Sequence, residues 1–146
     1  MSEPVQYLFT LECHGTELAE IRAQAMRPSL EHLNRYDDAM VRKRFLDSFV
    51  PEYTTRIIHQ QSLVGFFVVI PEAEFLFLNH LYLLPEVQGA GIGGSIVSQI
   101  QSQAETLGKK ARLAALAESP ANDFYLARGF KLTHRDTFDN YYEWQA

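Results

Sequence analysis

The segment Leu81-Tyr82-Leu83-Leu84-Pro85-Glu86-Val87-Gln88-Gly89-Ala90-Gly91-Ile92-Gly93-Gly94 carries four glycines within six residues. It predicts the end of a strand, a short turn and the glycine-rich start of a helix. Glycines let backbone N–H groups approach a ligand closely, and a helix N-terminus adds partial positive charge. Glycines also destabilise a helix, so the need for a tight turn does not by itself explain four glycines at this place. The segment therefore predicts a cradle for a pyrophosphate group.

Two classes of pyrophosphate-binding protein share features of this segment. Gly89, Gly91 and Gly94 satisfy the G-x-G-x-x-G dinucleotide fingerprint, and Glu118 follows the next predicted strand, where a ribose-binding acid could lie. However, residues 85–88 separate the strand from the loop, and the dinucleotide fold needs several βαβ units. A dinucleotide-binding oxidoreductase is therefore the weaker interpretation. A triphosphate-binding loop fits less well still, because the required lysine is missing.

The flanking sequence predicts a single α/β domain over residues 1–146, with a mixed central sheet and helices on both faces. An antiparallel N-terminal meander is followed by a βαβ unit, whose first strand is apolar on both sides and is expected at the centre of the sheet. Strands are expected at residues 5–11, 54–59, 63–70, 75–84, 111–117, 130–138 and 141–144. Helices are expected from Thr16 to Pro28, at 37–49, at 93–107 with a buried face from Ile92 to Leu107, and from a Ser119 N-cap to Gly129. The last hairpin is expected to turn at Asp139 and Asn140.

Composition narrows the class of protein. The 146 residues are 47% hydrophobic and 21% charged, as in an ordinary globular chain, and the net charge of -5 argues against a nucleic-acid partner. The single cysteine, Cys13, excludes an internal disulfide and a cysteine-based metal site, and the scattered histidines predict no metal site of their own. No secretory signal or membrane-spanning run is evident, so the expected location is cytoplasmic, with no membrane partner.

The glycine segment resembles the acetyl-CoA-binding motif of the GNAT superfamily of N-acetyltransferases. That motif is a hydrophobic strand, a proline and then [QR]-x-x-G-x-[GA], and here Pro85, Gln88 and Gly91 stand in those places. A second stretch, residues 119–130, resembles the family's late helix, which ends in an F-Y-x-x-x-G-F signature. The two motifs occur in the family's order and spacing, and the element order agrees over nearly the whole chain. The resemblance implies the GNAT fold and transfer of an acetyl group from acetyl-CoA to an amine.

The resemblance also implies which residues bind the cofactor. Backbone groups of the central strand would hold the pantetheine arm, and the glycine loop would wrap the pyrophosphate. The family often has asparagine where this chain has Ser119, so the pantetheine contact there could come from Asn122 instead. The implied cofactor-binding residues are Leu81, Tyr82, Leu83, Gln88, Gly89, Ala90, Gly91, Ile92, Gly93, Gly94, Ser95, Ser119, Asn122 and Tyr125.

Acetyl transfer needs a proton donor for the departing thiolate and a proton acceptor for the amine. Tyr125 matches the family's tyrosine, and its phenol, with an ordinary pKa of about 10, can protonate a thiolate; the other interpretation is a packing residue beside Phe124. His80 on the central strand is the candidate base, because imidazole titrates near neutrality. The alternative is that His80 is a structural histidine held by hydrogen bonds. Many members of the family carry a glutamate a little upstream on this strand, and here the carboxylate nearest to that place is Glu74.

The acceptor is expected to be a primary amine on a small molecule or a protein. Tyr36 and Asn79 are the candidate substrate-binding residues, and Asp37 and Asp38 could attract a cationic amine or simply cap a helix. A non-catalytic acyl-CoA-binding module is the main alternative to an enzyme. Exposed edges of the C-terminal hairpin make a homodimer an expectation.

Overall fold

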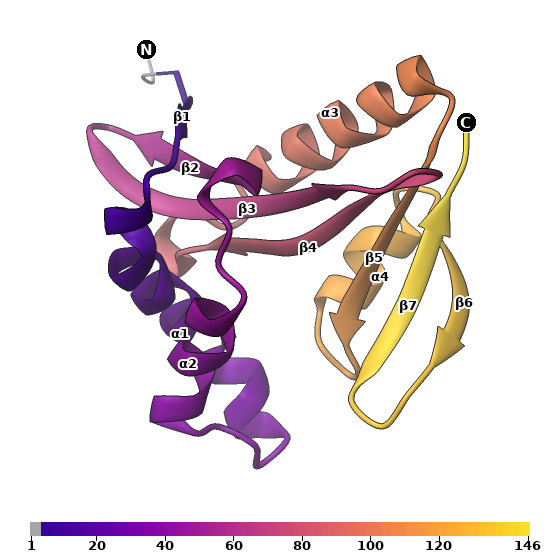
Figure 1. Cartoon of the computed structure of the whole chain (residues 1–146). Helices are drawn as coiled ribbons and strands as arrows, with labels where there is room; N and C mark the ends of the chain where they lie inside the picture. The colour runs from indigo at the N-terminus through magenta and orange to yellow at the C-terminus, as the bar shows by residue number, and fades with distance from the viewer. Residues whose placement is uncertain (1–3) are drawn as a thin grey trace. The chain divides into compact units, whose positions relative to one another are not determined.

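The computed structural model describes residues 4–146, which form a mixed α/β structure (Figure 1). In chain order its elements are β1 (Gln6–Phe9), η1 (Glu12–His14), α1 (Gly15–His32), α2 (Asp38–Asp47), η2 (Pro51–Tyr53), β2 (Thr54–His59), β3 (Ser62–Pro71), β4 (Phe75–Leu83), η3 (Pro85–Val87), α3 (Ile92–Leu107), β5 (Lys110–Leu116), α4 (Ala121–Leu126), β6 (Lys131–Arg135) and β7 (Asp139–Trp144).

The strands form one seven-stranded sheet in the order β1-β2-β3-β4-β5-β7-β6. Residues 75–78 of β4 pair in parallel with residues 110–113 of β5, which makes β4-α3-β5 the predicted βαβ unit. β1 with β2, β2 with β3, β5 with β7 and β6 with β7 pair antiparallel. The mixed sheet, with the doubly apolar strand β4 as its central member, confirms the predicted fold class.

The chain divides into two compact units. The first consists of Met1–Val68 and His80–Gly93, and the second of Val69–Asn79 and Gly94–Ala146. β3 and β4 contribute to both units. A single domain spanning residues 1–146 stays a prediction.

In the first unit, α1 and α2 lie side by side (Figure 1). Helix α2 begins as predicted, because the Asp37 side chain accepts hydrogen bonds from the backbone N–H groups of Ala39 and Met40, at 3.1 and 2.9 Å. Apolar side chains at helical spacing on both helices are buried with alternate residues of β2 and β3. This core contains Leu18, Ile21, Val41, Phe45, Ile57 and Phe66.

Helix α1 differs from its predicted boundaries at both ends. It begins at Gly15, and the preceding His14 provides no side-chain cap, so Thr16 is not the cap residue. Pro28 lies inside the helix, which continues to His32. Proline removes one backbone hydrogen bond, but the turn around it is spanned by an ion pair between Arg27 and Glu31. Proline was therefore the wrong signal for the end of this helix.

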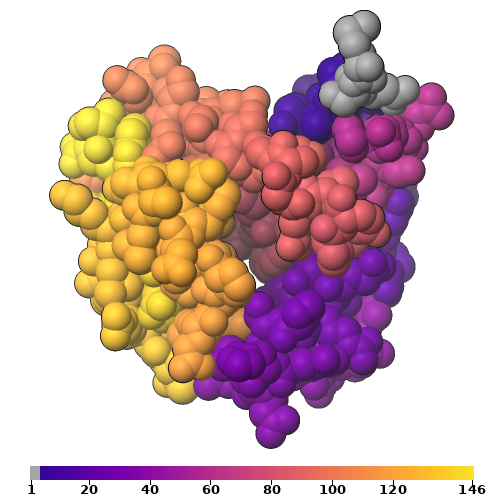
Figure 2. Space-filling model, turned by 180° about the vertical axis from the view of Figure 1, so that it is seen from behind, coloured from indigo at the N-terminus to yellow at the C-terminus, as the bar shows by residue number. Residues whose placement is uncertain are grey.

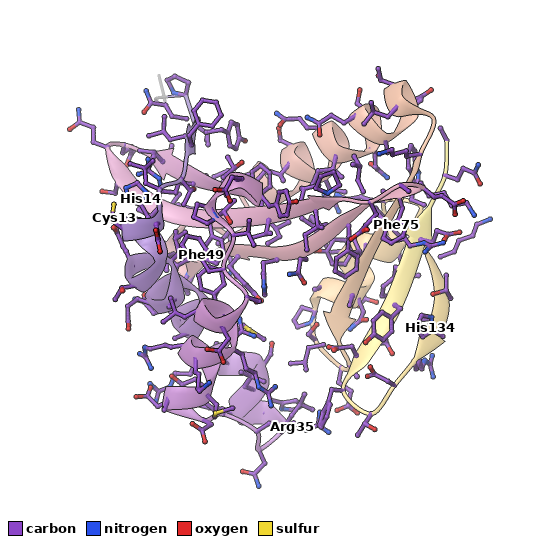
Figure 3. The ribbon with its side chains drawn as sticks, in the orientation of Figure 1. Cys13, His14, Arg35, Phe49, Phe75 and His134 are labelled. Carbon is purple, nitrogen blue, oxygen red and sulfur yellow. The ribbon has the colours of Figure 1, made fainter. Side chains whose placement is uncertain are left out.

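An aromatic ring explains why this helix begins with glycine. Phe49, which follows α2, lies beside the first turn of α1, close to the labelled His14 (Figure 3). A Cβ on Gly15 would come within 3.0 Å of the Phe49 ring. Phe49 in turn packs on Phe45, with ring centroids 5.3 Å apart, and Phe45 packs on Phe66 at 5.0 Å. This row of rings joins the start of α1, α2 and β3.

In the second unit, α3 buries one apolar face that includes Ile96, Val97, Ile100 and Ala104. The predicted face extends one turn too far, because Leu107 is 58% exposed at the helix end. Gly108 follows the last helical residue in the left-handed conformation, with φ of +67°. Strand β5 follows directly.

Two turns of the second unit differ from the prediction. Helix α4 ends at Leu126 rather than at Gly129, and its N-cap residue is Pro120, without a side-chain cap from Ser119. The closing hairpin turns at residues 136–138, because the Asp136 carboxylate accepts hydrogen bonds from the N–H groups of Phe138 and Asp139, at 2.9 and 2.8 Å. Asp139 and Asn140 are therefore the first residues of β7 rather than the turn.

Strand β6 ends the sheet order and is exposed at all five residues. Its surface and that of α4 lie on the face shown in Figure 2. The predicted homodimer through this hairpin stays a prediction. Among residues 4–146, no helix is both long and apolar enough to span a bilayer.

Gly65 of β3 lets the backbone of β4 approach closely, and this generates a prediction. A Cβ at position 65 would lie 2.3 Å from the carbonyl oxygen of Tyr82 and 2.9 Å from the side chain of Leu83. Because a backbone oxygen cannot move aside without shifting β4, Gly65→Ala should lower the free energy of unfolding by about 3 kcal/mol. Urea denaturation measures the change. Ser62→Ala, at an exposed position of the same strand, is the control and should stay within about 0.5 kcal/mol of wild type. A Gly65→Ala protein as stable as Ser62→Ala would contradict this account.

Candidate active site

The glycine loop follows β4 and η3 and runs into α3. Gly89 and Gly91 have φ of +83° and +84°, and a Cβ at either position would meet nothing within 4 Å. These two glycines are therefore required by the backbone conformation and not by crowding. The loop is exposed from Gln88 to Gly91. Exposed backbone with open space around it is the arrangement that a phosphate cradle needs.

The surroundings of this segment differ at its two ends. On the strand side, the Gln88 side chain folds back and donates to the carbonyl oxygen of Leu83 at 2.9 Å. On the helix side, Gly94 leaves room for the Arg128 side chain, because a Cβ there would lie 2.6 Å from a guanidinium nitrogen. The first turn of α3 contains no acidic residue, so its partial positive charge is not neutralised locally. Gln88 thus ties the loop to the strand that precedes it.

The end of β4 carries a polar cluster that belongs wholly to the first unit. The hydroxyl oxygen of Tyr82 lies 2.9 Å from Nδ1 of His80 and accepts a hydrogen bond from Nε of Arg22 at 3.3 Å. The His80 ring also contacts the rings of Phe45 and Phe66, with centroids 5.6 and 6.5 Å away. A histidine, a phenol and a guanidinium thus meet at the end of β4.

The charge state of His80 follows from these surroundings. Burial, together with the positive charge of Arg22, lowers the pKa of His80 from its ordinary 6.5 to about 4. The imidazole is therefore neutral at physiological pH. When the ring's single proton lies on Nδ1, that N–H donates to the Tyr82 hydroxyl, and the lone pair of Nε2 is left free to accept a proton.

Tyr125 lies in an aromatic cluster of the second unit. The residue is 7% exposed, and its ring makes edge contacts with Phe124 and Phe130, at centroid distances of 5.1 and 5.8 Å. Tyr142 lies 6.4 Å away at a tilted angle. The packing role that the sequence allowed for this ring is present. A role as proton donor stays a prediction.

Asn122 is a structural centre of the second unit. Its amide group donates to the carbonyl oxygens of Leu116 and Ser119, at 3.0 and 2.9 Å. Its side-chain oxygen accepts from Asn140 and from the Tyr142 hydroxyl, at 2.9 and 2.8 Å. All four ordinary hydrogen-bonding positions of the amide are thus used within the protein. A pantetheine contact through this side chain would have to replace one of these bonds.

The candidate acceptor residues lie in different units. Tyr36 is half-buried in the first unit, donates to the Asp38 carboxylate at 2.8 Å and stacks under Arg27. Asp38 also pairs with Arg42 at 3.0 Å, and Asp37 caps α2, so neither carboxylate is a free cation site. Asn79 is half-buried on β4 in the second unit, and its side chain has no hydrogen-bonding partner among residues 4–146. In the same range, no group of three or more His, Cys, Asp or Glu could hold a metal ion.

In the polar cluster of Arg22, His80 and Tyr82, Arg22 is the residue that the sequence analysis did not identify. It lies on the apolar stripe of α1, one turn after Leu18 and next to Ile21, and only 9% of it is exposed. A charged residue at a buried helical position was the signal that could have identified it.

Comparisons with known proteins agree with the geometry. The family model of the acetyltransferase (GNAT) domain matches residues 51–132, more than half of the chain. The PaiA N-acetyltransferase from Thermoplasma acidophilum in complex with coenzyme A aligns with a TM-score of 0.81 and 17% identity, over 99% of this chain and 100% of that one. An acetyltransferase from Thermus thermophilus aligns with a TM-score of 0.73 and 18% identity, over 99% of each chain. Ard1 from Thermoplasma volcanium aligns with a TM-score of 0.67 and 15% identity, over 96% of each. At these identities the likeness shows the fold, and no curated protein matches the chain.

The lowered pKa of His80 predicts a pH dependence of stability. Since the folded protein holds the pKa of His80 near 4 and the unfolded chain has it near 6.5, the unfolded state binds the proton more readily. Stability should therefore fall as the pH drops from about 6.5 toward 4, with a slope of at most about 1.4 kcal/mol per pH unit from this residue. His80→Gln should flatten the profile, measured by urea unfolding at pH 7, 6 and 5. The exposed His32→Gln is the control and should keep the wild-type slope. Equal slopes in wild type and His80→Gln would contradict the assignment.

Proposed function

Because the chain belongs to the GNAT acetyltransferase family, we propose that it transfers an acetyl group from acetyl-CoA to a primary amine on a small molecule or a protein. The observation that carries this proposal is the loop from Gln88 to Gly91, exposed, held to β4 by Gln88 and running into an α3 N-terminus without acidic residues. An acyl-CoA supplies the thioester, and acetyl is the acyl group that the family resemblance implies. The competing ligand, a dinucleotide, is disfavoured because β1 with β2, β2 with β3, β5 with β7 and β6 with β7 all pair antiparallel, whereas the dinucleotide fold needs a mostly parallel sheet.

The residues present fit a CoA molecule by their chemistry. Backbone N–H groups of the loop and of the α3 start, residues 88–95, would bind the pyrophosphate. Backbone groups of Leu81, Tyr82 and Leu83 would hold the pantetheine arm, and one N–H of this stretch would stabilise the developing oxyanion, an effect typically of a few kcal/mol. Backbone groups near Ser119 would add a further contact with the pantetheine arm. The Asn122 amide could make that contact only by giving up one of its hydrogen bonds within the protein.

Tyr125 is proposed as the general acid. A phenol stays protonated at neutral pH and can give its proton to the leaving thiolate. The aromatic contacts with Phe124, Phe130 and Tyr142 would fix the ring so that its hydroxyl has one direction.

His80 is proposed as the proton acceptor. Its role is limited to the proton that the amine loses after attack, because its pKa is too low for it to deprotonate the free ammonium. An imidazole with a pKa of about 4 is a poor acceptor for a free ammonium of pKa about 10.4. The amine would therefore bind already neutral, and His80 would take the proton after attack, when the nitrogen has become far more acidic. Tyr82 would orient the imidazole through the 2.9 Å hydrogen bond with Nδ1.

The first prediction concerns ligand binding. Acetyl-CoA should raise the melting temperature, and NAD at the same concentration should not, because a ligand of the native state stabilises it by mass action. Gly91→Val should abolish this shift, since valine is strained at φ of +84° and would displace the loop. Gly108→Val is the matched control: its φ is +67°, its Cβ would also meet nothing within 4 Å, and it lies at the other end of α3. It should keep the acetyl-CoA shift. Stabilisation by NAD and none by acetyl-CoA would overturn the assignment.

A second prediction concerns Tyr125→Phe. The change removes a hydroxyl and keeps the ring, so acetyl-CoA affinity should stay nearly constant while turnover falls about 100- to 10,000-fold where chemistry limits the rate. Rapid-quench measurement of the acetyl-transfer step, together with acetyl-CoA titration, checks both parts. Tyr53→Phe, at a partly exposed position of the first unit, is the control and should change neither. A chemical step within about twofold of wild type would leave Tyr125 a packing residue. Binding of acetyl-CoA without transfer to any amine would indicate a non-catalytic acyl-CoA-binding module instead.

A further inference from the structure

Arg22 is a nearly buried cation with unusual partners. Its Nε donates to the Tyr82 hydroxyl at 3.3 Å, and one Nη donates to the backbone carbonyl of Val41 in α2. Its guanidinium carbon lies 6.0 Å from the centre of the Tyr82 ring. Neutral groups therefore accept all its hydrogen bonds within residues 4–146.

The other cations of the two helices are compensated differently. Three of them have carboxylate partners: Arg27 pairs with Glu31, Arg42 with Glu20 and Asp38, and Lys43 with Asp47, whereas the exposed Arg44 faces solvent. Arg22, by contrast, has no carboxylate partner among the described residues, although it is the most buried of these cations. A buried charge without a counter-ion is costly, because it loses hydration and gains nothing equivalent. His80 cannot neutralise it, since the imidazole can carry only a positive charge or none.

The guanidinium also has unused hydrogen-bonding capacity. One Nη has no protein partner, and it is not among the fully buried unpartnered side-chain atoms of the described chain, of which Thr10 Oγ1 is the example. That nitrogen is therefore not completely buried. The rings of Phe45 and Phe66 pack on His80 in the same cluster, so a charge in this cluster is weakly screened. A guanidinium with free N–H groups in such a setting is suited to a carboxylate.

We infer that Arg22 binds a carboxylate of the acceptor, so that the preferred acceptors are amino acids and related amines that carry a carboxylate near the nucleophilic nitrogen. This inference rests on the proposed acetyl transfer, and it names the acceptor class for that reaction. Tyr82 connects the proposed carboxylate site with the proposed cofactor site. Its hydroxyl accepts a hydrogen bond from Arg22, and its backbone belongs to the part of β4 that would hold the pantetheine arm. An acceptor with its carboxylate on Arg22 would thus have its amine beside that strand.

A purely structural role for Arg22 would give a different result. An arginine that only joins α1 to Val41 and Tyr82 would affect stability and the turnover of all acceptors equally. An arginine that binds the acceptor's carboxylate distinguishes an amino acid from the amine that lacks it. The two roles therefore differ in the ratio of kcat/KM for an amino acid to kcat/KM for the amine that lacks its carboxylate. A general loss of activity does not change this ratio.

The experiment compares matched acceptor pairs that differ only in the carboxylate: lysine with cadaverine, ornithine with putrescine, and phenylalanine with phenethylamine. Thiol release from acetyl-CoA gives kcat/KM for each member. The wild-type protein should prefer the carboxylate member of at least one pair by about tenfold or more, the effect of one charge-assisted hydrogen-bonded pair. Arg22→Met should reduce that preference to about one by raising KM for the amino acid, while KM for the decarboxylated partner stays the same. Arg44→Met removes a charge from an exposed position of α2 and should keep the wild-type ratio.

Each outcome is decisive. Transfer to amines without any preference for the carboxylate member overturns the inference and leaves the proposed function intact, as does a preference that survives Arg22→Met. Binding of acetyl-CoA with no transfer to any pair overturns both the inference and the enzymatic proposal. If Arg22→Met does not fold, the wild-type ratio still tests the inference, and Arg22→Lys, which keeps the charge and loses the planar fork, should give a ratio between wild type and one.

Discussion

The close approach of β3 to the end of β4 is the constraint on which the first unit depends. Gly65 has no side chain, so the carbonyl of Tyr82 lies where a Cβ would otherwise be. This fixes the backbone of Tyr82 and hence the position of its hydroxyl between His80 and Arg22. One residue further, the Leu83 carbonyl accepts the Gln88 side chain, which holds the start of the glycine loop. One missing methyl group thus supports the polar cluster and the loop alike.

Electrostatics gives the polar cluster its character. A guanidinium that has no carboxylate partner among residues 4–146 shares one phenol oxygen with a neutral imidazole, beside the rings of Phe45 and Phe66. In water such a group of residues would have ordinary proton affinities, but burial penalises a second positive charge beside the first. The same imbalance that makes His80 a weak base leaves Arg22 able to bind an anion. Basicity and anion recognition at the end of β4 therefore have one physical cause.

The glycines of the decisive segment serve separate purposes, which sequence alone could not distinguish. Gly89 and Gly91 are needed for left-handed backbone conformations, whereas Gly94 lies against the end of the Arg128 side chain, which a Cβ there would push aside. The sequence predicted a glycine-rich loop between an apolar strand and a helix, and the structure has this loop; binding of a phosphate by its backbone stays a prediction. The sequence could not assign Gly94 to its neighbour, because Arg128 lies far along the chain, after β5 and α4.

The sequence by itself determined the fold class, the order of nearly all elements and the family, because hydrophobic periodicity and glycine-rich motifs are local properties of the chain. It erred where a local signal competes with a contact from elsewhere. Pro28 was expected to stop α1, which continues, and the Asp136 side chain moved the last turn away from Asp139 and Asn140. Tertiary structure alone decided that Asn122 is occupied by Leu116, Asn140 and Tyr142, and that a guanidinium from α1 meets a phenol and an imidazole from β4. Proton affinity and hydrogen-bond satisfaction depend on which groups surround an atom in space, and no pattern along the chain records that.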